Sequence, residues 1–431
     1  MAHSYEQNRK REYAKGGVSF PLLLITITLI LIGVVMVFSS TYVSTVLSGH
    51  EGYRNAVQHT IVAVLCILII CIGNKLFNYR WLNQKKFVWL AVIGTIGLLG
   101  LVFLFPARND AHRWIEIGPL TIQPSEIAKF VAVIYMAYFA SHNRYWYSKI
   151  STVAMFFAVS IAFAGLIFLE PNLSTTVICI VGPALIMALV SGLNLTWAVI
   201  GGILAVAFGV YVMFNTDWRA GRMLAWLDPW YDPKDVSFQV VQSLYALGNG
   251  GLFGVGLGNS KQKISYLPMK DTDYIFAIIA EEFGFIGAAL VIALYAAFVF
   301  FAIKVALKAP DAFGCFLAVG ITVIVAMQAI VNIAVVTNTI PSTGVTLPFI
   351  SRGTSSLLCF SVGAMLLLNI SRYSKQKKDD GAEGRRVRGL TEDASRAYGA
   401  NDPTPIDTPT RKERHSTQRT RNNQRRPRHQ R

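Results

Sequence analysis

Residues 20–40 read FPLLLITITLILIGVVMVFSS, an apolar stretch without a single charged side chain. A helix that crosses a bilayer of about 30 Å needs roughly 20 consecutive apolar residues, so this stretch predicts a transmembrane helix. The run is longer than the apolar part of a secretory signal peptide, and no small-residue cleavage site follows it cleanly. We therefore expect residues 20–40 to remain in the protein as a membrane span.

Further apolar runs follow along the chain. Together with the first, they predict ten spans, at residues 20–40, 55–73, 87–105, 125–140, 152–169, 173–190, 196–214, 274–303, 313–336 and 355–371. Hydrophobic residues make up 53% of the 431 residues and charged residues only 15%, whereas a soluble domain carries about a quarter charged residues. This composition excludes a single soluble globule. The expected fold is all-α: a polytopic integral membrane protein with about ten transmembrane helices.

The five cysteines all lie within the apolar runs and show no metal-ligand spacing. A buried cysteine behaves as a small hydrophobic residue. We therefore expect neither a disulfide nor a zinc site.

Basic residues in the short loops predict the orientation of the chain. They are concentrated in the N-terminal segment and in loops of the same parity, at Arg9, Lys10, Arg11, Lys15, Lys75, Arg80, Lys85, Lys86, Arg144, Lys149, Lys304 and Lys308. Because cytoplasmic loops are enriched in Lys and Arg, both termini should face the cytoplasm of a multi-pass protein in the cytoplasmic membrane. The predicted organisation is a cytoplasmic segment at residues 1–17, a transmembrane domain at 18–372 and a cytoplasmic tail at 373–431.

The predicted tail is strongly basic. Counted from Arg372, the last residue before it, the stretch to Arg431 has 17 basic and 8 acidic residues, which is +9 of the formal net charge of +16. Large apolar residues are almost absent from it, so we expect the tail to be disordered. Such a tail can bind anionic lipid or nucleic acid. We favour a solvated tail that reinforces the topology or docks a partner, and we expect no nucleic acid.

Polar residues outside the tail gather in the segments predicted to face outward, 106–126, 215–273 and 337–354. The second of these is a large extracytoplasmic loop between the seventh and eighth spans. A long connection without obvious secondary structure is usually functional or disordered, and this one is rich in aromatic residues and glycine. The chemistry is therefore expected on the outer face.

The first outward segment combines Arg113 and Trp114 with Glu126 and Lys129. Pro124, Ser125 and Glu126 are typical of a helix start with a polar cap and an early acid. Lys129 follows Glu126 by three residues and so lies on the same helix face. An acid–base pair in or near a membrane is costly and suggests a function, although a structural ion pair between helices is the alternative.

The large loop contains a glycine-rich run at residues 248–260 with basic residues on both sides, at Arg219, Arg222, Lys261 and Lys263. Glycine permits a close approach of the backbone, and basic side chains beside a glycine loop suit a pyrophosphate. Asp273 follows where the chain re-enters the membrane. Partial desolvation would raise its pKa toward the range of a general base, although an acid favoured by the N-terminus of a helix is the alternative.

The third segment, residues 341–356, contains two prolines and a glycine between apolar runs. Non-helical backbone at membrane depth is tolerated where it lines a cavity or is buried in protein. Ser351, Arg352 and the start of the following helix could bind an anion there.

These segments carry a resemblance to a known family. R-W-I-x-x-G and Q-P-S-E-x-x-K between Arg113 and Lys129, and T-G-V-T-L-P-F-I-S at Thr343–Ser351, resemble the SEDS family (shape, elongation, division and sporulation), whose members include FtsW, RodA and SpoVE. The resemblance covers roughly residues 18–372. The segment Gln242–Lys263 is more similar to the cell-division branch than to the elongation branch.

The resemblance implies a peptidoglycan glycosyltransferase, a hexosyltransferase that polymerises lipid II on the outer face of the cytoplasmic membrane during septal wall synthesis and cell division. It implies a class B penicillin-binding protein, a transpeptidase, and other division proteins as partners, and a location at the division septum. The family's essential aspartate falls on Asp273. Its Arg-Trp pair falls on Arg113 and Trp114, and its acid–base pair on Glu126 and Lys129.

The sequence also departs from the family pattern. Asn172 stands where the family often has an acid, Arg352 replaces an aromatic residue, and Met269 and Asp271 replace the usual acid and histidine near the aspartate. None of these departures removes Asp273.

For the reaction we expect Asp273 to act on the acceptor hydroxyl. Basic residues on the outer face, and a divalent cation such as Mg²⁺ or Mn²⁺, would stabilise the departing undecaprenyl pyrophosphate. Two alternatives stay open: a flippase that carries lipid II across the membrane, and a division-site scaffold without enzymatic activity. A flippase should show internal repeats and polar residues at the bilayer midplane, and neither is evident in this sequence.

Overall fold

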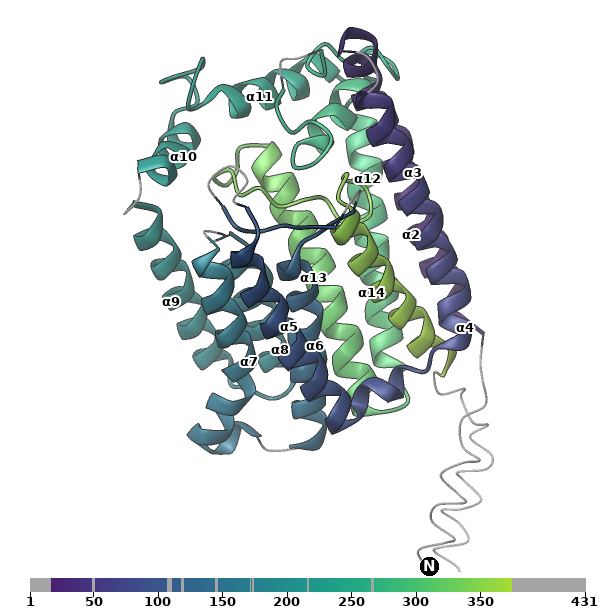
Figure 1. The fold of residues 1–431 in the computed structure, drawn as a ribbon, viewed down its shortest axis with the longest axis vertical. Helices are drawn as coiled ribbons and strands as arrows, with labels where there is room; N and C mark the ends of the chain where they lie inside the picture. Colours follow the sequence, from purple (N-terminus) through teal and green to yellow (C-terminus); the bar gives the residue numbers. More distant parts are fainter. Residues whose placement is uncertain are drawn as a thin grey trace, which may run out of the picture. The chain divides into compact units, whose positions relative to one another are not determined.

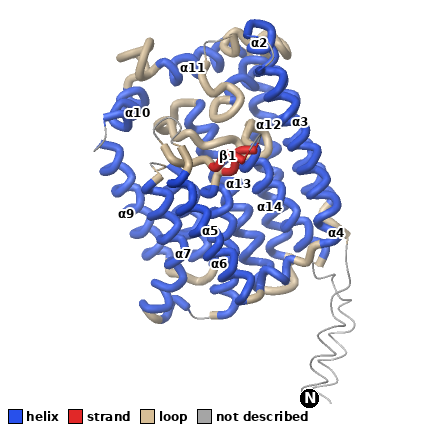
Figure 2. Tube along the Cα trace, viewed as in Figure 1, coloured by secondary structure: helices blue, strands red, loops and turns tan. Residues whose placement is uncertain are grey.

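The computed structural model describes residues 17–48, 51–106, 111–117, 120–143, 146–170, 172, 174–214, 217–264 and 267–373. The elements are α2 (Phe20–Ser48), α3 (Glu51–Leu68), η1 (Ile69–Gly73), α4 (Asn74–Leu76), η2 (Tyr79–Asn83), α5 (Lys85–Leu101), η3 (Val102–Leu104), β1 (Ile115–Ile117), β2 (Leu120–Ile122), α6 (Pro124–His142), η4 (Trp146–Ser148), α7 (Ile150–Leu169), η5 (Thr175–Val181), α8 (Gly182–Val190), α9 (Leu195–Phe214), α10 (Asp217–Leu227), α11 (Phe238–Gly250), α12 (Ile275–Leu307), α13 (Ala312–Val336) and α14 (Thr354–Arg372). Figures 1 and 2 show a bundle of long helices, which confirms the predicted all-α membrane fold.

Each of the ten predicted spans falls on helix. Among the described residues, seven helices are long and apolar enough to cross a membrane: Phe20–Thr41, Arg54–Leu76, Lys85–Leu104, Ile150–Leu169, Ile275–Leu307, Ala312–Val336 and Thr354–Arg372. The other three predicted spans correspond to α6, to η5 followed by α8, and to α9. Nearly all of α6 is buried. Because protein rather than lipid surrounds α6, this helix tolerates two charged side chains that a lipid-facing helix would not.

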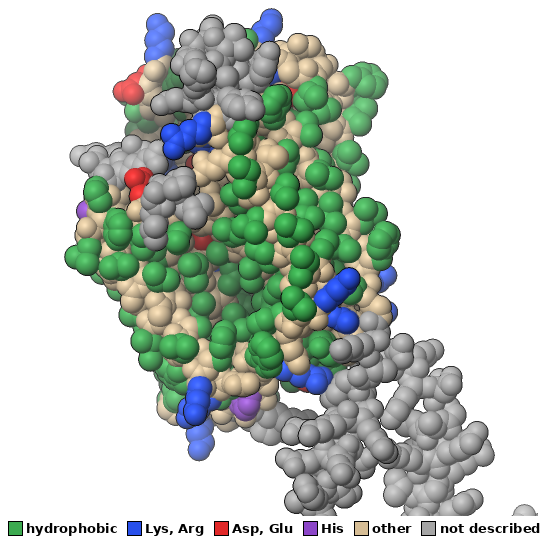
Figure 3. Space-filling view, turned by 45° about the vertical axis from the view of Figure 1, so that its right-hand side comes forward, with side chains coloured by type: hydrophobic (Ala, Val, Ile, Leu, Met, Phe, Trp, Pro, Cys, Tyr) green, Lys and Arg blue, Asp and Glu red, His purple; other side chains and the backbone are tan. Residues whose placement is uncertain are grey.

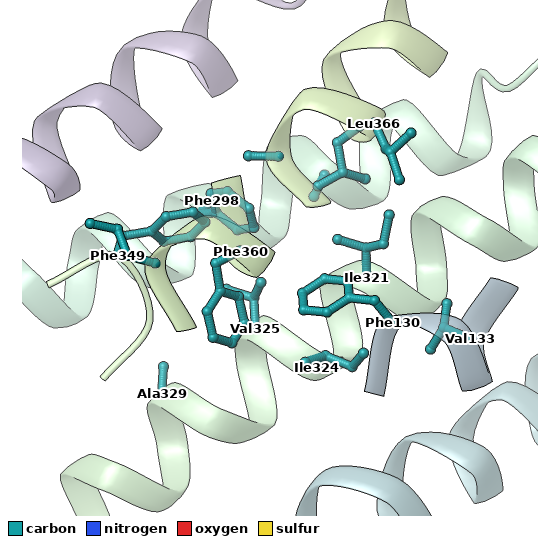
Figure 4. Close-up of a cluster of buried hydrophobic side chains, with 14 of the residues drawn as sticks. Phe130, Val133, Phe298, Ile321, Ile324, Val325, Ala329, Phe349, Phe360 and Leu366 are labelled. Carbon is teal, nitrogen blue, oxygen red and sulfur yellow. The ribbon is translucent and has the colours of Figure 1, made fainter. Parts of the chain in front are cut away.

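The core lies around α13, which packs against α12, α6, α8 and α14. Figure 4 shows how these helices meet: Ile321, Ile324, Val325 and Ala329 of α13 face Phe130 and Val133 of α6, Phe298 of α12, and Phe360 and Leu366 of α14. Phe349 enters this core from the loop that follows α13, with its ring 5.5 Å from that of Phe298 and 5.7 Å from that of Phe360. Its backbone has a φ of +67°, an unusual value for a bulky residue, so burial of the ring keeps the loop in place.

The segment 215–273 is not the plain loop that the sequence analysis expected. It contains the two helices α10 and α11, which lie toward the upper end of the bundle in Figure 1. α11 packs against α12 and α13, and α10 against α9. A short antiparallel hairpin, β1–β2, precedes α6 and pairs Ile115 with Ile122. The outward segments of the sequence analysis are therefore folded over the bundle.

Residues 1–16 and 374–431, which hold almost all of the cytoplasmic N-terminal segment and of the basic tail, lie outside the described residues.

Candidate active site

Asp273 lies in the turn that leads into α12 and is half-buried. Its backbone carbonyl accepts a hydrogen bond from Nδ2 of Asn332 on α13, at 2.7 Å. The loop between α13 and α14 passes directly over the carboxylate: a Cβ atom at Gly344 would lie 3.6 Å from Oδ2 of Asp273. Two segments about 70 residues apart in the sequence, 270–274 and 341–350, thus meet at this side chain.

Burial raises the pKa of Asp273 to about 6. The guanidinium of Arg222 opposes the rise, Asp271 adds to it, and the guanidinium of Arg113 opposes it again. The dominant cause is the loss of water around the carboxylate, which disfavours the charged form. A carboxylate with a pKa near 6 is still ionised at neutral pH and is a stronger base than an ordinary aspartate.

Two arginines from different segments lie near this carboxylate. Arg222 belongs to α10 and donates from Nη1 to the carbonyl of Ser342 at 3.2 Å, so it reaches the loop that covers Asp273. Arg113 precedes β1 and donates from Nε to the carbonyl of Glu170 at 3.1 Å. Both are half-buried, as is the neighbouring Trp114. The tertiary structure therefore gathers one carboxylate and two guanidinium groups at one end of the bundle.

Arg352 and Ser351 join the loop after α13 to the turn that carries Asp273. Nε of Arg352 lies 2.9 Å from Oδ2 of Asp271, and the Arg352 amide donates to the Asp271 carbonyl at 2.8 Å. Oγ of Ser351 donates to the carbonyl of Thr272 at 2.6 Å and accepts from the amide of Leu347 at 2.8 Å. The buried Ser351 therefore serves to hold the two segments together. A third of the Arg352 side chain stays exposed, so it can still face a ligand.

Glu126 and Lys129 form the predicted pair, but deep in the protein. Nζ of Lys129 lies 2.8 Å from Oε1 of Glu126, and the side chains are 1% and 8% exposed. Lys129 also donates to Oε1 of Gln328 on α13 at 2.7 Å. The helix begins as predicted at Pro124, although its N-cap is Gln123, without a side-chain cap. Lys129 is enclosed by protein and supports α13, as the alternative of a structural ion pair expects, and its contact with substrate stays a prediction.

Lys263 is likewise buried. Its Nζ lies 2.7 Å from Oε1 of Glu282 on α12 and donates to Oγ of Ser39 on α2 at 3.1 Å. The carboxylate of the adjacent Glu281 accepts a hydrogen bond from the hydroxyl of Ser260 and another, at 3.1 Å, from the backbone amide of Lys261. The Lys261 side chain is exposed. Both lysines were expected at a pyrophosphate; in this structure Lys263 pairs with Glu282 instead, and the contact of either lysine with substrate stays a prediction.

The glycine-rich run serves the fold. Gly254 has a φ of +83°, and a Cβ atom there would lie 2.1 Å from the carbonyl oxygen of Glu282. The amides of Val255 and Gly256 donate to the carbonyls of Glu281 and Glu282, both at 3.0 Å. The glycines therefore allow the run to approach the backbone of α12, where the predicted use was the approach to a phosphate.

Arg219 lies in α10, but its side chain is outside the part of the chain that the structure describes. Its predicted contact with substrate stays a prediction.

The sequence analysis missed two features of the site. Glu170 is fully buried at the end of α7, and neither of its carboxylate oxygens has a hydrogen-bond partner among the residues that the structure describes. Burial raises the pKa of Glu170 to about 8, and Arg113 opposes the rise. The second feature is the pair of buried amides on α13, Gln328 and Asn332. The sequence offered two signals for these features. One is a single acid after an apolar run, and the other is a pair of amides four residues apart within a span.

An apolar cavity of about 320 Å³ lies between α7, η5, α8 and α9. Its lining includes Phe157, Phe168, Leu185 and Phe208, and its polar groups come only from Ser160 and Thr176 among the side chains that line it. A cavity of this kind suits a hydrocarbon chain.

The chain was compared with known families and proteins. Residues 20–376 match the FtsW, RodA and SpoVE family, described as "Cell cycle protein". Stage V sporulation protein E of Bacillus subtilis (strain 168) is 36% identical over 358 residues, which is 82% of this chain and 97% of that protein. The probable peptidoglycan glycosyltransferase FtsW of Geobacter sulfurreducens (strain DL-1 / KN400) is 35% identical over 357 residues, 82% of this chain and 95% of that protein.

Solved structures share the fold. A chain from a study reported as "Structural coordination of polymerization and crosslinking by a peptidoglycan synthase complex" matches with a TM-score of 0.67 and 25% identity, over 84% of this chain and 99% of that one. The rod shape determining protein RodA of Thermus thermophilus matches with a TM-score of 0.60 and 22% identity, over 84% of this chain and 98% of that one. The family match spans almost the whole described bundle, Asp273 and its surroundings included, and the chain belongs to the FtsW, RodA and SpoVE family of cell cycle proteins, the SEDS family.

Proposed function

We propose that this protein is a peptidoglycan glycosyltransferase that polymerises lipid II into glycan strands during septal wall synthesis and cell division. A relative named probable peptidoglycan glycosyltransferase FtsW aligns with this chain over 95% of its own length. The observation that carries the proposal for this chain is the grouping at Asp273: a half-buried carboxylate with a pKa raised to about 6, close to Arg222 and Arg113. A base beside two cations suits a hydroxyl nucleophile and an anionic leaving group.

In the proposed reaction, the sugar hydroxyl of the acceptor attacks the anomeric carbon of the growing, lipid-linked chain. The new glycosidic bond forms as the bond from that carbon to the pyrophosphate oxygen breaks, and undecaprenyl pyrophosphate leaves with the electron pair. Asp273 takes the hydroxyl proton, a role typically worth about 10²–10⁴-fold in rate. Arg222, Arg113 and the exposed part of Arg352 stabilise the negative charge on the leaving group.

The apolar cavity between α7 and α9 is the proposed place for part of the isoprenoid chain. It is lined almost entirely by hydrocarbon and lies in the membrane-spanning part of the bundle. The tail of the substrate would stay in an apolar environment there while its pyrophosphate faces the arginines.

A divalent cation is part of the proposal. The described residues contain no group of three His, Cys, Asp or Glu side chains that could hold a metal ion alone. Mg²⁺ is usually held by one or two carboxylates together with substrate phosphates. Asp271 is paired with Arg352 and Asp273 serves as the base, so Mg²⁺ or Mn²⁺ would be held chiefly through the pyrophosphate of the substrate. When bound, the ion would neutralise charge on the leaving group.

The partners and location follow from the same function. One structural relative comes from a peptidoglycan synthase complex. We propose that this chain works with a class B penicillin-binding protein, a transpeptidase, and other division proteins at the septum. The basic residues of the short loops support an orientation with both termini in the cytoplasm and Asp273 at the outer face.

The test is lipid II polymerisation by the purified protein together with its transpeptidase. Asp273→Asn should abolish polymer formation, while Asp235→Asn, an exposed acid of the same segment, should leave it unchanged. Removal of divalent cations with EDTA should lower the rate, and Mg²⁺ or Mn²⁺ should restore it. A wild-type rate in folded Asp273→Asn would refute the catalytic assignment, and an unchanged rate in EDTA would refute the cation.

The flippase alternative is separated by a second assay. Proteoliposomes that carry lipid II only in the leaflet next to Asp273 should still form polymer, since polymerisation there requires no transport. If polymer appears only when lipid II starts in the opposite leaflet, transport becomes the better assignment.

A further inference from the structure

Two buried amide side chains on α13 face the loop that covers Asp273. Gln328 and Asn332 are four residues apart, which places them one above the other on the helix, and both are 1% exposed. Neither takes part in the proposed reaction. Buried amides inside a membrane bundle need hydrogen-bond partners, so their partners show what they do in the fold.

Asn332 joins two segments by one nitrogen atom. Its Nδ2 donates to the backbone carbonyl of Asp273 and to that of Val345, both at 2.7 Å. Its Oδ1 is buried without a hydrogen-bond partner among the described residues. The side-chain amide of Asn332 thus binds two carbonyls through its nitrogen, those of Asp273 and of Val345, which follows Gly344.

Gln328 holds the same loop one residue further on. Its Nε2 donates to the backbone carbonyl of Thr346 at 3.1 Å and to the Thr346 hydroxyl at 3.2 Å. Its Oε1 accepts from the buried Nζ of Lys129 at 2.7 Å. A continuous set of hydrogen bonds thus runs from the ion pair inside the bundle to the loop over Asp273.

We infer that Asn332 is a positioning residue for Asp273: it sets the place of the carboxylate by tying the turn before α12 to the loop over that turn, and Gln328 secures the loop beside it. This inference rests on the proposed function of Asp273. A hydrogen bond to a backbone carbonyl cannot exchange protons with substrate, so the role acts through the geometry and the enclosure of Asp273. Without the bridge, the turn and the loop would separate and water would reach the carboxylate.

The experiment compares two leucine variants. Asn332→Leu removes both donors with little change in side-chain volume and adds no charge. Asn369→Leu is the matched control, because Asn369 is also fully buried and its Nδ2 also donates to two carbonyls, those of Asn74 at 2.9 Å and Phe77 at 2.7 Å. This second bridge lies near the opposite end of α14 from Asp273.

For Asn332→Leu we expect kcat of lipid II polymerisation to fall about 10- to 100-fold with a smaller change in KM, since a displaced catalytic group costs rate more than binding. The acidic limb of the pH–rate profile should move from about 6 toward the ordinary pKa of aspartate. Asn369→Leu should lower the thermal midpoint but leave the acidic limb in place. Equal acidic limbs in the two variants and the wild type would overturn the inference.

A second readout does not depend on activity. Infrared titration of ¹³C-carboxyl-labelled aspartate, with the spectrum of Asp273→Asn subtracted, reports the pKa of Asp273 directly. A lower value in Asn332→Leu supports the inference even if the assignment of Asp273 as the base fails, and an unchanged value overturns it. If Asn332→Leu does not fold, Asn332→Ser keeps one hydroxyl donor and should show a smaller shift in the same direction. Loss of activity in Asp273→Asn tests the proposed function separately.

Discussion

At the scale of single residues, Asp273 and Glu170 show how the same functional group takes different properties from its surroundings. Asp273 is half-buried with two arginines nearby, and its pKa is raised to about 6. Glu170 is fully buried, its carboxylate has no hydrogen-bond partner in the described part of the chain, and its pKa is raised to about 8. At pH 7 the first is mostly ionised and the second mostly neutral. Only Asp273 is therefore suited to accept a proton.

Asp273 and Glu170 should differ in their roles in activity. The ionisation of either one should lower the thermal midpoint as the pH rises. A carboxyl whose pKa is higher in the folded than in the unfolded state stabilises the fold at low pH, and this contribution is lost as pH rises through the folded pKa. The thermal midpoint of the wild type should therefore decline from about pH 4, less steeply above pH 6 and no further above pH 8. Asp273→Asn should remove the change of slope near pH 6, and Glu170→Gln should remove the decline between pH 6 and pH 8, as measured by thermal unfolding in detergent from pH 4 to 9.

Stability and activity should separate in this experiment. Asp273→Asn should raise the midpoint at pH 7.5 while abolishing polymerisation, because the variant removes a charge that the fold desolvates. A midpoint curve for Asp273→Asn that still becomes less steep near pH 6 would mean that another group titrates there.

At the scale of elements, α12 is interrupted where the glycine-rich run meets it. Gly284 has a φ of +67° inside the helix, and the amides of Phe285 and Ile286 donate to the carbonyls of Gly251 and Leu252 at 2.9 and 3.2 Å. Just before this break, Glu282 pairs with Lys263. At the break, amides of α12 therefore donate to carbonyls of the glycine-rich run. The buried ion pair holds the run against the helix.

Because this ion pair is buried, removing one partner should lower the free energy of unfolding much more than removing both. Lys263→Met leaves the carboxylate of Glu282 buried with Ser39 as its remaining hydrogen-bond donor, so the free energy of unfolding should fall by about 3–5 kcal/mol. Lys263→Met combined with Glu282→Met should recover most of the loss, since replacing both ions by apolar side chains is often neutral. Chemical unfolding in mixed micelles measures both.

A partly exposed pair serves as the control. Nε of Arg80 lies 3.6 Å from Oδ2 of Asp311, with side chains 34% and 32% exposed. Arg80→Met should cost at most about 1 kcal/mol, as is usual for surface pairs. A loss of this small size for Lys263→Met would show that Lys263 is not buried as an ion pair in the folded protein.

At the scale of the whole molecule, apolar and charged side chains occupy different parts of the surface of the described residues. On the face shown in Figure 3, hydrophobic side chains fill the middle, and Lys and Arg gather toward its upper and lower margins. The long helices run between these margins (Figure 1). In water such an apolar surface would be a liability, whereas in a bilayer it is solvated by lipid.

The proposed orientation predicts which ends of the helices react with an impermeant thiol reagent. In a cysteine-free background, Asp235→Cys, in the segment between α10 and α11, should be labelled on intact cells. Lys308→Cys, in the exposed turn between α12 and α13, should be labelled only after the membrane is permeabilised. The reverse pattern would place Asp273 in the cytoplasm and contradict an extracytoplasmic reaction.

The membrane class, the ten helical runs and the local pair of Glu126 and Lys129 could all be predicted from the order of the residues. These features depend on short-range chemistry: about 20 apolar residues suffice to span a bilayer, and side chains three residues apart share a helix face. Asp273 could be singled out as well, because its position at the start of a span is a local property of the chain.

Which polar groups meet became visible once the helices were packed together. Lys263 was expected at a pyrophosphate, yet it binds Ser39, which is 224 residues away, and Glu282. Asn332 was an unremarked amide within a span until the fold brought the carbonyls of Asp273 and Val345 to it. In a membrane bundle each buried polar group must find its partner within the protein, and that partner depends on which helices become neighbours. Neighbouring helices are chosen by packing over the whole chain, so no local pattern of residues contains that information.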